Sequence, residues 1–308
     1  MPYRTKSDTL KVPGATIYYE VRGSGPVLLM IPGGPADAGG FAGLAEHLAD
    51  HYTVVAYDPR GNSRSTFDGE PEEQRLDVHS DDAARLIEAF GADPAYVFGS
   101  SGGGQIGLNL AARHPERVHT LVAHEPPCLR MLPDPSEALA GMQEVYETYL
   151  RDGVGPGMQK FMEVTGLGGG PQRENAPQQL EPSPEARAAF ARIGGNLNYF
   201  LAHGLKPISF YVPEVSALRA AAVRVVVGVG ETSAGQLAHR TAVALAEKLG
   251  TEPVPFPGDH GGYGSHPEAF AEVLHRIFRG PGTPREEAGS AVEAGDVRGD
   301  DRRVRSRR

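Results

Sequence analysis

The sequence predicts an α/β fold in which helices cover both faces of a mostly parallel sheet. Short apolar runs typical of buried strands alternate along the chain with amphipathic segments typical of helices. Several of these runs end at loops rich in glycine, proline and short polar residues. One run passes through a glycine-rich turn directly into a helix, as parallel strand-helix units do.

The first part of the chain contains most of the predicted sheet. Residues 8–20 alternate polar and apolar residues, which indicates a solvent-facing hairpin, and residues 27–31 are continuously apolar, which indicates a central strand. Further strands are expected at 53–57, 95–98 and 118–123. Helices are expected at 40–51, 75–90 and 102–114.

The pattern changes after residue 126. Three helices, at 138–151, 158–165 and 185–200, follow one another with no convincing strand between them. The sheet pattern then resumes with strands at 223–229 and 253–256 and helices at 236–249 and 267–278. We therefore expect an α/β core of residues 1–126 and 221–279 and a helical lid of residues 127–220. Residues 280–308 have almost no apolar side chains and are expected to be disordered.

Composition excludes several classes of function. A formal net charge of −9 and a pI near 5.7 provide no electrostatic basis for binding nucleic acid or an acidic membrane. The sequence has no targeting signal and no apolar run of membrane-spanning length, so a cytoplasmic location is expected. The single cysteine, Cys128, is interpreted as a small apolar residue, and no His/Cys/Asp cluster has metal-ligand spacing. We expect no metal and no organic cofactor; the sequence does not define an oligomeric state.

The glycine-rich turn contains a candidate nucleophile. Residues 99–103 read Gly-Ser-Ser-Gly-Gly, which is a Gly-x-Ser-x-Gly pattern centred on Ser101. A serine at the tip of a strained strand-to-helix turn needs small neighbours, because a Cβ at either flank would clash with nearby backbone. Glycine and serine runs are also common in flexible linkers. A linker would not separate an apolar strand from a helix and a second strand, so the context favours a nucleophile elbow.

A serine hydroxyl is a weak nucleophile and needs a base within hydrogen-bond reach. Of the eleven histidines, His260 is the candidate, because it lies in a loop of small residues after the last strand. Histidines such as His47, His79 and His114 fall on or near predicted helix ends and surfaces. The order nucleophile, acid, histidine is also the order found in sheets with such an elbow.

These motifs resemble those of the α/β-hydrolase superfamily, and the resemblance extends from residue 8 to residue 279. The loop 32–35, Pro-Gly-Gly-Pro, is similar to the oxyanion loop of the family, and the loop 58–65 is similar to its Asp-x-Arg-Gly-x-Gly-x-Ser loop. The resemblance implies that the backbone N–H groups of Gly34 and Gly102 form the oxyanion hole, although Pro32 replaces the usual histidine. It implies a structural role for the loop 58–65.

The acid of the triad departs from the common pattern of the family. Ser233 stands where an aspartate is expected after the strand that follows the lid. Some relatives, including certain dehalogenases and lactonases, place the acid after the strand that follows the elbow helix. That position is Glu125 in this chain, and Glu231 is the alternative. Position alone favours Glu125, which would hold the other nitrogen of the histidine.

Because the nucleophile is a serine, the resemblance implies acyl transfer. We expect hydrolysis of a carboxylic ester or lactone of a small, largely apolar molecule, with apolar lid residues such as Phe161 and Phe200 either in the pocket or in the core. A proline iminopeptidase, a cofactor-free perhydrolase and a thioesterase remain alternatives. A non-enzymatic alternative is a ligand-binding protein that retained the fold.

Overall fold

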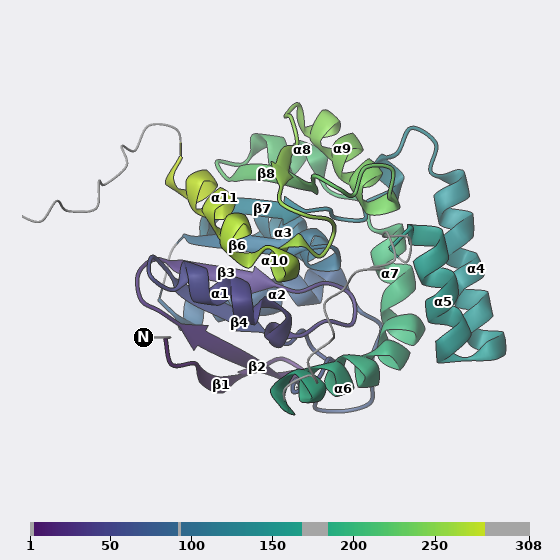
Figure 1. Ribbon diagram of the computed structural model, residues 1–308, viewed down its shortest axis with the longest axis horizontal. Coiled ribbons are helices and arrows are strands. Elements are labelled where there is room, and N and C mark those ends of the chain that lie inside the picture. The colour runs from purple at the N-terminus through teal and green to yellow at the C-terminus, as the bar shows by residue number, and fades with distance from the viewer. Residues whose placement is uncertain (1–2, 92–93, 168–183, 281–308) are drawn as a thin grey trace, which may run out of the picture.

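The computed structural model describes residues 3–91, 94–167 and 184–280 (Figure 1). Its strands form one sheet in the order β1-β2-β4-β3-β6-β7-β8-β9, with β5 paired to β2. The strands are β1 (Lys6–Val12), β2 (Ala15–Arg22), β3 (Val27–Ile31), β4 (Thr53–Tyr57), β5 (Thr66–Phe67), β6 (Ala95–Ser100), β7 (Val118–His124), β8 (Arg224–Gly230) and β9 (Val254–Phe256). Pairing is parallel from β4 through β9 and antiparallel where β2 meets β1, β4 and β5.

Helices cover both faces of the sheet. They are α1 (Ala42–Leu48), α2 (Leu76–Ala89), α3 (Gly102–Arg113), α4 (Ser136–Asp152), α5 (Val154–Thr165), α6 (Pro184–Tyr199), α7 (Leu205–Phe210), α8 (Val215–Ala220), α9 (Leu237–Leu249), α10 (Gly262–Ser265) and α11 (Pro267–Arg279). One apolar cluster joins the sheet to α1 and α11, and a second joins the other face to α2, α3, α8 and α9. Every residue of β3 is buried, as expected for a strand covered on both faces.

The amphipathic helices follow the predicted spacing closely. In α11 the buried residues Phe270, Val273, Leu274 and Ile277 recur at the three- and four-residue intervals that place side chains on one helix face. Helices α2, α3, α9 and α11 each begin and end within two residues of the predicted bounds. The sequence-based prediction of a mostly parallel sheet flanked by helices is therefore confirmed.

Helices α4 to α7 occupy the expected lid region between β7 and β8 (Figure 1). They lie beyond the carboxyl ends of the parallel strands, and α4 packs alongside α5. Between α6 and α7 the chain forms one π-helical turn, Phe200–Gly204. Figure 1 shows these helices grouped at one end of the sheet, the end at which β6 runs into α3.

Several predictions of local structure were incomplete. The helix expected at 40–51 is a short 3₁₀ turn, Ala38–Phe41, followed by α1, which ends at Leu48. The sequence pattern did not reveal β5, α7, α8 or α10, which have two to six residues each. The tail predicted at 280–308 lies outside the described residues apart from Gly280. Within the described ranges no helix is long and apolar enough to cross a membrane.

Candidate active site

Ser101 lies in a sharp turn between β6 and α3. Its backbone has φ 55° and ψ −125°, a conformation that a residue with a side chain rarely adopts. The Ser101 N–H donates to the carbonyl oxygen of His124 at 2.9 Å, which ties the turn to the end of β7. Strained backbone of this kind persists only where the surroundings hold it, and it is concentrated at functional sites.

The flanking glycines are required by close backbone contacts. A Cβ on Gly103 would lie 2.0 Å from the carbonyl oxygen of Ile31, and one on Gly99 would lie 2.3 Å from that of Gly103. Both distances are far below van der Waals contact, so no larger residue fits without displacing backbone. The spacing that identified the elbow in the sequence therefore has a steric cause in the structure.

Glu125 and His260 are in direct contact. The Oε2 atom of Glu125 lies 2.7 Å from Nδ1 of His260. Glu125 directly follows β7 and is fully buried, whereas the His260 side chain is 17% exposed. The loop after β8 is hydrogen-bonded to the His260 loop, because Thr232 N donates to the Gly258 carbonyl at 3.0 Å. These contacts bring together residues that are 135 positions apart in the sequence.

The second carboxylate oxygen of Glu125 is also occupied. Oε1 accepts a hydrogen bond from Gly230 N at 2.9 Å and another from the hydroxyl of Ser233. Burial raises the pKa of Glu125, but the hydrogen bond from His260, the electrostatic influence of His124 and His260, and the hydrogen bond from Ser233 lower it to about 2. Ser233, which stands where an aspartate was expected, thus donates to Glu125, the predicted acid.

The alternative acid lies elsewhere. Glu231 is exposed, and its backbone N–H donates to Phe256 at 2.9 Å. Its carboxylate makes no hydrogen bond with His260 in the part of the chain that the structure describes. The geometry therefore supports Glu125 as the partner of His260, while the catalytic role of either residue stays a prediction.

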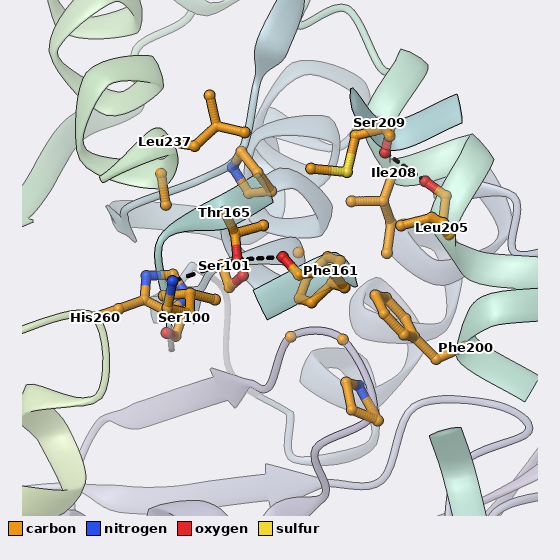
Figure 2. A pocket seen from close by; sticks show the side chains of 18 of the residues that line it. Ser100, Ser101, Phe161, Thr165, Phe200, Leu205, Ile208, Ser209, Leu237 and His260 are labelled. Atoms are coloured by element: carbon orange, nitrogen blue, oxygen red, sulfur yellow. Dashed lines mark hydrogen bonds between the residues drawn. The ribbon is translucent and has the colours of Figure 1, made fainter. Parts of the chain in front are cut away.

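Ser101 and His260 line the same cavity (Figure 2). Within the described residues no hydrogen bond of 3.5 Å or less joins the two side chains. Catalytic hydrogen bonds of this type are often long before a substrate is bound and shorten in the reacting complex. The two side chains therefore face one cavity without a hydrogen bond between them.

The two predicted oxyanion donors are neighbours. A Cβ on Gly102 would lie 3.4 Å from the backbone nitrogen of Gly34, so the two backbones approach closely. Gly102 is the first residue of α3, where free N–H groups and the helix dipole favour negative charge. Gly34 has φ 55°, and the Ala36 N–H donates to the Gly33 carbonyl at 3.1 Å, which closes a tight turn around it.

The cavity next to Ser101 measures about 210 Å³ and is largely apolar. Figure 2 shows Ser101 and His260 on one side and Phe200, Leu205 and Ile208 on the other. Two hydroxyls in the cavity wall already donate hydrogen bonds to backbone carbonyls. Thr165 donates to the Phe161 carbonyl, and Ser209 donates to the Leu205 carbonyl. Apart from His260, none of the lining residues has an ionisable group that is charged near neutral pH.

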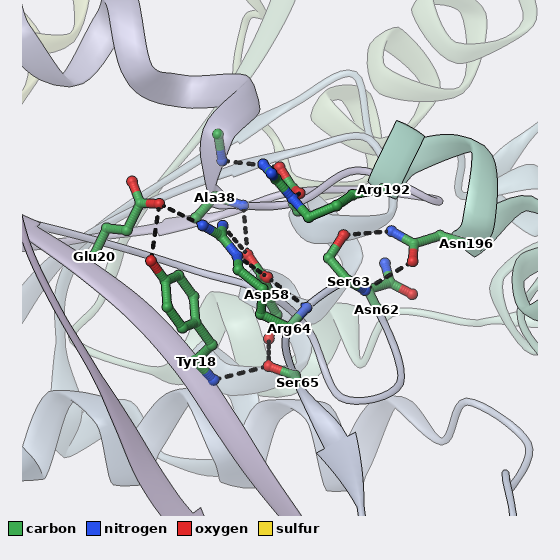
Figure 3. Close-up of polar contacts among 12 residues, drawn as sticks. Tyr18, Glu20, Ala38, Asp58, Asn62, Ser63, Arg64, Ser65, Arg192 and Asn196 are labelled. Atoms are coloured by element: carbon green, nitrogen blue, oxygen red, sulfur yellow. Dashed lines mark hydrogen bonds and ion pairs between the residues drawn. The ribbon is translucent and has the colours of Figure 1, made fainter. Parts of the chain in front are cut away.

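The loop 58–65 is joined to neighbouring segments by hydrogen bonds and ion pairs, which agrees with its expected structural role. Asp58 is fully buried and accepts hydrogen bonds from Arg64 and from the Ala38 N–H (Figure 3). Arg60 binds Asp82 through two hydrogen bonds of 2.7 Å. The first ion pair lies within the loop, and the second ties the loop to α2.

Two buried histidines were not identified from the sequence. His124 is fully buried next to Glu125, with its ring 6.3 Å from that of His260. His79, which the sequence placed near a surface or helix end, is instead 2% exposed in α2 and lines a small cavity that Gly34 and Gly102 also line. Burial lowers the pKa of each histidine to about 3. No pattern in the sequence distinguishes them from exposed histidines.

The described residues contain no group of three or more His, Cys, Asp or Glu side chains that could hold a metal ion. Cys128 is buried in the core, and burial raises the pKa of its thiol to about 12. Its thiol is therefore protonated at neutral pH, in line with the interpretation of Cys128 as a packing residue.

Comparisons with known proteins agree with this fold. Residues 26–175 match the family described as the alpha/beta hydrolase fold. A protein of Bacillus subtilis (strain 168) named "Uncharacterized hydrolase YraK" is 39% identical over 277 residues, which cover 88% of this chain and 95% of the relative. The chain therefore belongs to the α/β-hydrolase family, and it is a hydrolase.

Solved structures extend the comparison of the fold. A thermophilic esterase from Thermogutta terrifontis is 20% identical, with a TM-score of 0.68 over 88% of this chain and 98% of that one. The enol-lactonase from Burkholderia xenovorans LB400 is 17% identical, with a TM-score of 0.65 over 88% of this chain and all of that one (100%). At these identities the similarity shows a common fold.

The buried histidines lead to a prediction about acid stability. In the unfolded chain each binds a proton below about pH 6.5, but the folded protein holds them neutral down to about pH 3. Lowering the pH through this window should therefore reduce the free energy of unfolding by about 1.4 kcal/mol per pH unit for each histidine. Urea unfolding between pH 7 and pH 5 measures the slope.

The variant His79→Leu should unfold with a shallower pH dependence, by about one proton, because one of the two linked sites is gone. His47→Leu, which removes an exposed histidine of α1, controls for the loss of a histidine as such. Equal slopes for the parent and His79→Leu would show that His79 does not contribute to the linkage.

Proposed function

We propose that this hydrolase cleaves a carboxylic ester or lactone through an acyl-Ser101 intermediate. The observation that carries the proposal is the contact between the buried carboxylate of Glu125 and His260. His260 lines the same cavity as Ser101. A histidine oriented by a carboxylate and placed beside a serine is the arrangement that activates a hydroxyl for acyl transfer.

The proposed reaction begins with attack of Ser101 Oγ on the substrate carbonyl. His260 takes the hydroxyl proton at Nε2. The contact with Glu125 keeps a proton on Nδ1, which leaves Nε2 as the acceptor. The carboxylate of Glu125 then stabilises the imidazolium. The N–H groups of Gly34 and Gly102 bind the oxyanion, and each such donor contributes about 3 kcal/mol to stabilising the transition state.

Collapse of the tetrahedral intermediate expels the leaving alcohol, to which His260 returns the proton. Water then attacks the acyl-serine with His260 again acting as the base, and the acid is released. In a lactone the alcohol and the acid belong to one molecule, so the same two steps open the ring.

The cavity supports a small, uncharged acyl or aryl group as the part of the substrate that enters. An apolar cavity of about 150 Å³ is known to hold a benzene ring, so the 210 Å³ found here suits a group somewhat larger than benzene. A peptide with a free amino terminus would need an acidic partner, and the described lining contains no carboxylate. This disfavours the iminopeptidase alternative.

The names of structural neighbours, an esterase and an enol-lactonase, are compatible with the proposal. A perhydrolase or a thioesterase would use the same serine and histidine, and no observation favours either. A pure binding function would not require the buried charge of Glu125, which is held by three hydrogen bonds beside His260.

A fluorophosphonate probe and p-nitrophenyl butyrate test the nucleophile. We expect the parent to hydrolyse the ester and to be labelled at one serine, Ser101, and the variant Ser101→Ala to lose at least about a thousandfold in kcat/KM. Ser100→Ala, which changes the adjacent serine, is the matched control and should retain labelling. Activity of Ser101→Ala within a few-fold of the parent would refute the proposal.

Moving the acid tests the role of Glu125. Glu125→Gln should reduce kcat by about 10³-fold to 10⁴-fold, because the amide no longer holds the correct tautomer of His260. In the double variant Glu125→Gly/Ser233→Asp a carboxylate returns at the neighbouring position. We expect the kcat of this double variant to be at least about tenfold higher than that of Glu125→Gln. Glycine suits residue 125, which has φ 45°.

Glu231→Gln is the matched control and should keep nearly parental activity, since its carboxylate does not contact His260. The assignment of Glu125 would be wrong if Glu125→Gln stayed active while Glu231→Gln did not.

A further inference from the structure

We infer that Asn196, on lid helix α6, is a positioning residue that fixes the direction in which the Gly34 N–H points. The inference rests on the proposed function, because it concerns the same oxyanion hole. It connects a lid side chain that does not line the cavity to the geometry of the transition-state site.

The Gly34 N–H belongs to a tight turn whose geometry decides where it points. The hydrogen bond from Ala36 N to the Gly33 carbonyl closes the turn, and Gly34 has a positive φ at its second position. The plane of the peptide between Gly33 and Gly34 sets the N–H direction. A rotation of this turn would therefore turn the donor away from the oxyanion.

Two asparagine side chains hold the successive carbonyl groups of this turn. Asn62 Nδ2 donates to the carbonyl oxygens of Gly34 and Ala36, each at 3.1 Å. Asn196 Nδ2 donates to the carbonyl between them, that of Pro35, at 2.8 Å. These three carbonyls and the Gly33 carbonyl, which accepts from Ala36 N, are all engaged, so the turn is held where Gly34 N lies next to Gly102.

Asn196 also links the turn to the loop 58–65, as Figure 3 shows. Its Oδ1 accepts from Ser63 N at 2.7 Å, and its Nδ2 donates to Ser63 Oγ at 2.8 Å. Ser63 has φ 49°, so this bond holds a strained residue next to Asn62. One side chain of the lid thereby fixes both the oxyanion turn and the loop that supplies the second asparagine.

Helix propensity does not explain why an asparagine occupies position 196 in α6. The sequence Gly194-Gly195-Asn196 consists of weak helix formers, so tertiary contacts must hold this part of α6. Asn196 is 5% exposed, and four residues earlier Arg192 Nε lies 2.7 Å from the buried carboxylate of Asp37. Residues four apart share a helix face, so one face of α6 contacts the segment 35–37 at two points.

The test compares Asn196→Asp with Asn198→Asp. Asn196→Asp keeps an oxygen for Ser63 N but loses the donor to the Pro35 carbonyl. Asn198 is exposed on the same helix and accepts only from Tyr149 OH, at 3.0 Å, among the described residues, so its variant is the matched control. Asn196→Ser provides the same comparison if Asn196→Asp fails to fold, which thermal melting reports.

We measure hydrolysis of p-nitrophenyl butyrate and inhibition by an alkyl boronic acid, which forms a tetrahedral adduct with serine. For Asn196→Asp we expect kcat to fall about tenfold or more with KM changed less than about twofold, because the oxyanion contact exists only in the transition state. The affinity for the boronic acid should fall in parallel. The pH dependence of kcat/KM should stay parental, since Glu125 and His260 are untouched.

A rise in KM with unchanged kcat would show that Asn196 only shapes the lid, and would overturn the inference. Equal losses in Asn198→Asp would do the same. Failure of the proposed function is distinguishable, because then the parent itself would not be labelled at Ser101 by a fluorophosphonate.

Discussion

The contact between Glu125 and His260 is the interaction on which the candidate site depends. It joins the end of β7 to the loop after β9, and it can form only because the intervening strand β8 holds the two at the same edge of the sheet. Ser101 reaches this edge from β6, the strand on the other side of β7. The order of neighbouring parallel strands therefore brings three distant segments together, and each provides one side chain.

The buried charge of Glu125 is stabilised by donors rather than by water. Burial alone would favour the neutral acid, and the bonds from Gly230, Ser233 and His260 reverse that preference. Among the described residues, the non-glycine residues with positive φ are Ser63, Ser101 and Glu125. All three lie at the candidate site or its support, which is where backbone strain is expected to be retained.

Much of this organisation could be predicted from the sequence, because it is local. The elbow follows from the spacing of two glycines around Ser101, and the long helices follow from three- and four-residue periodicity. Glu125 could be chosen over Glu231 only by its place after a strand, and no local pattern shows that Ser233 would donate to it. Short helices such as α7 and α10 contain too few residues for a periodic signal.

The features that escaped prediction depend on contacts between distant segments. His79 and His124 are buried because other elements cover them. Asn196 reaches Pro35 and Ser63 only because α6 packs against the core. The family similarity adds the fold and the hydrolase class. The described lining of the cavity, apart from His260, contains no group that is charged near neutral pH. Together these support our proposal that an uncharged group of the substrate binds beside Ser101.

The most direct measurement of the central contact is proton NMR of the imidazole ring of His260. A proton on Nδ1 that is shared with a buried carboxylate resonates far downfield of ordinary ring N–H protons. We expect such a resonance in the parent and in Glu231→Gln, and its loss in Glu125→Gln. A spectrum without this resonance, or one in which it disappears in Glu231→Gln and persists in Glu125→Gln, would contradict the account.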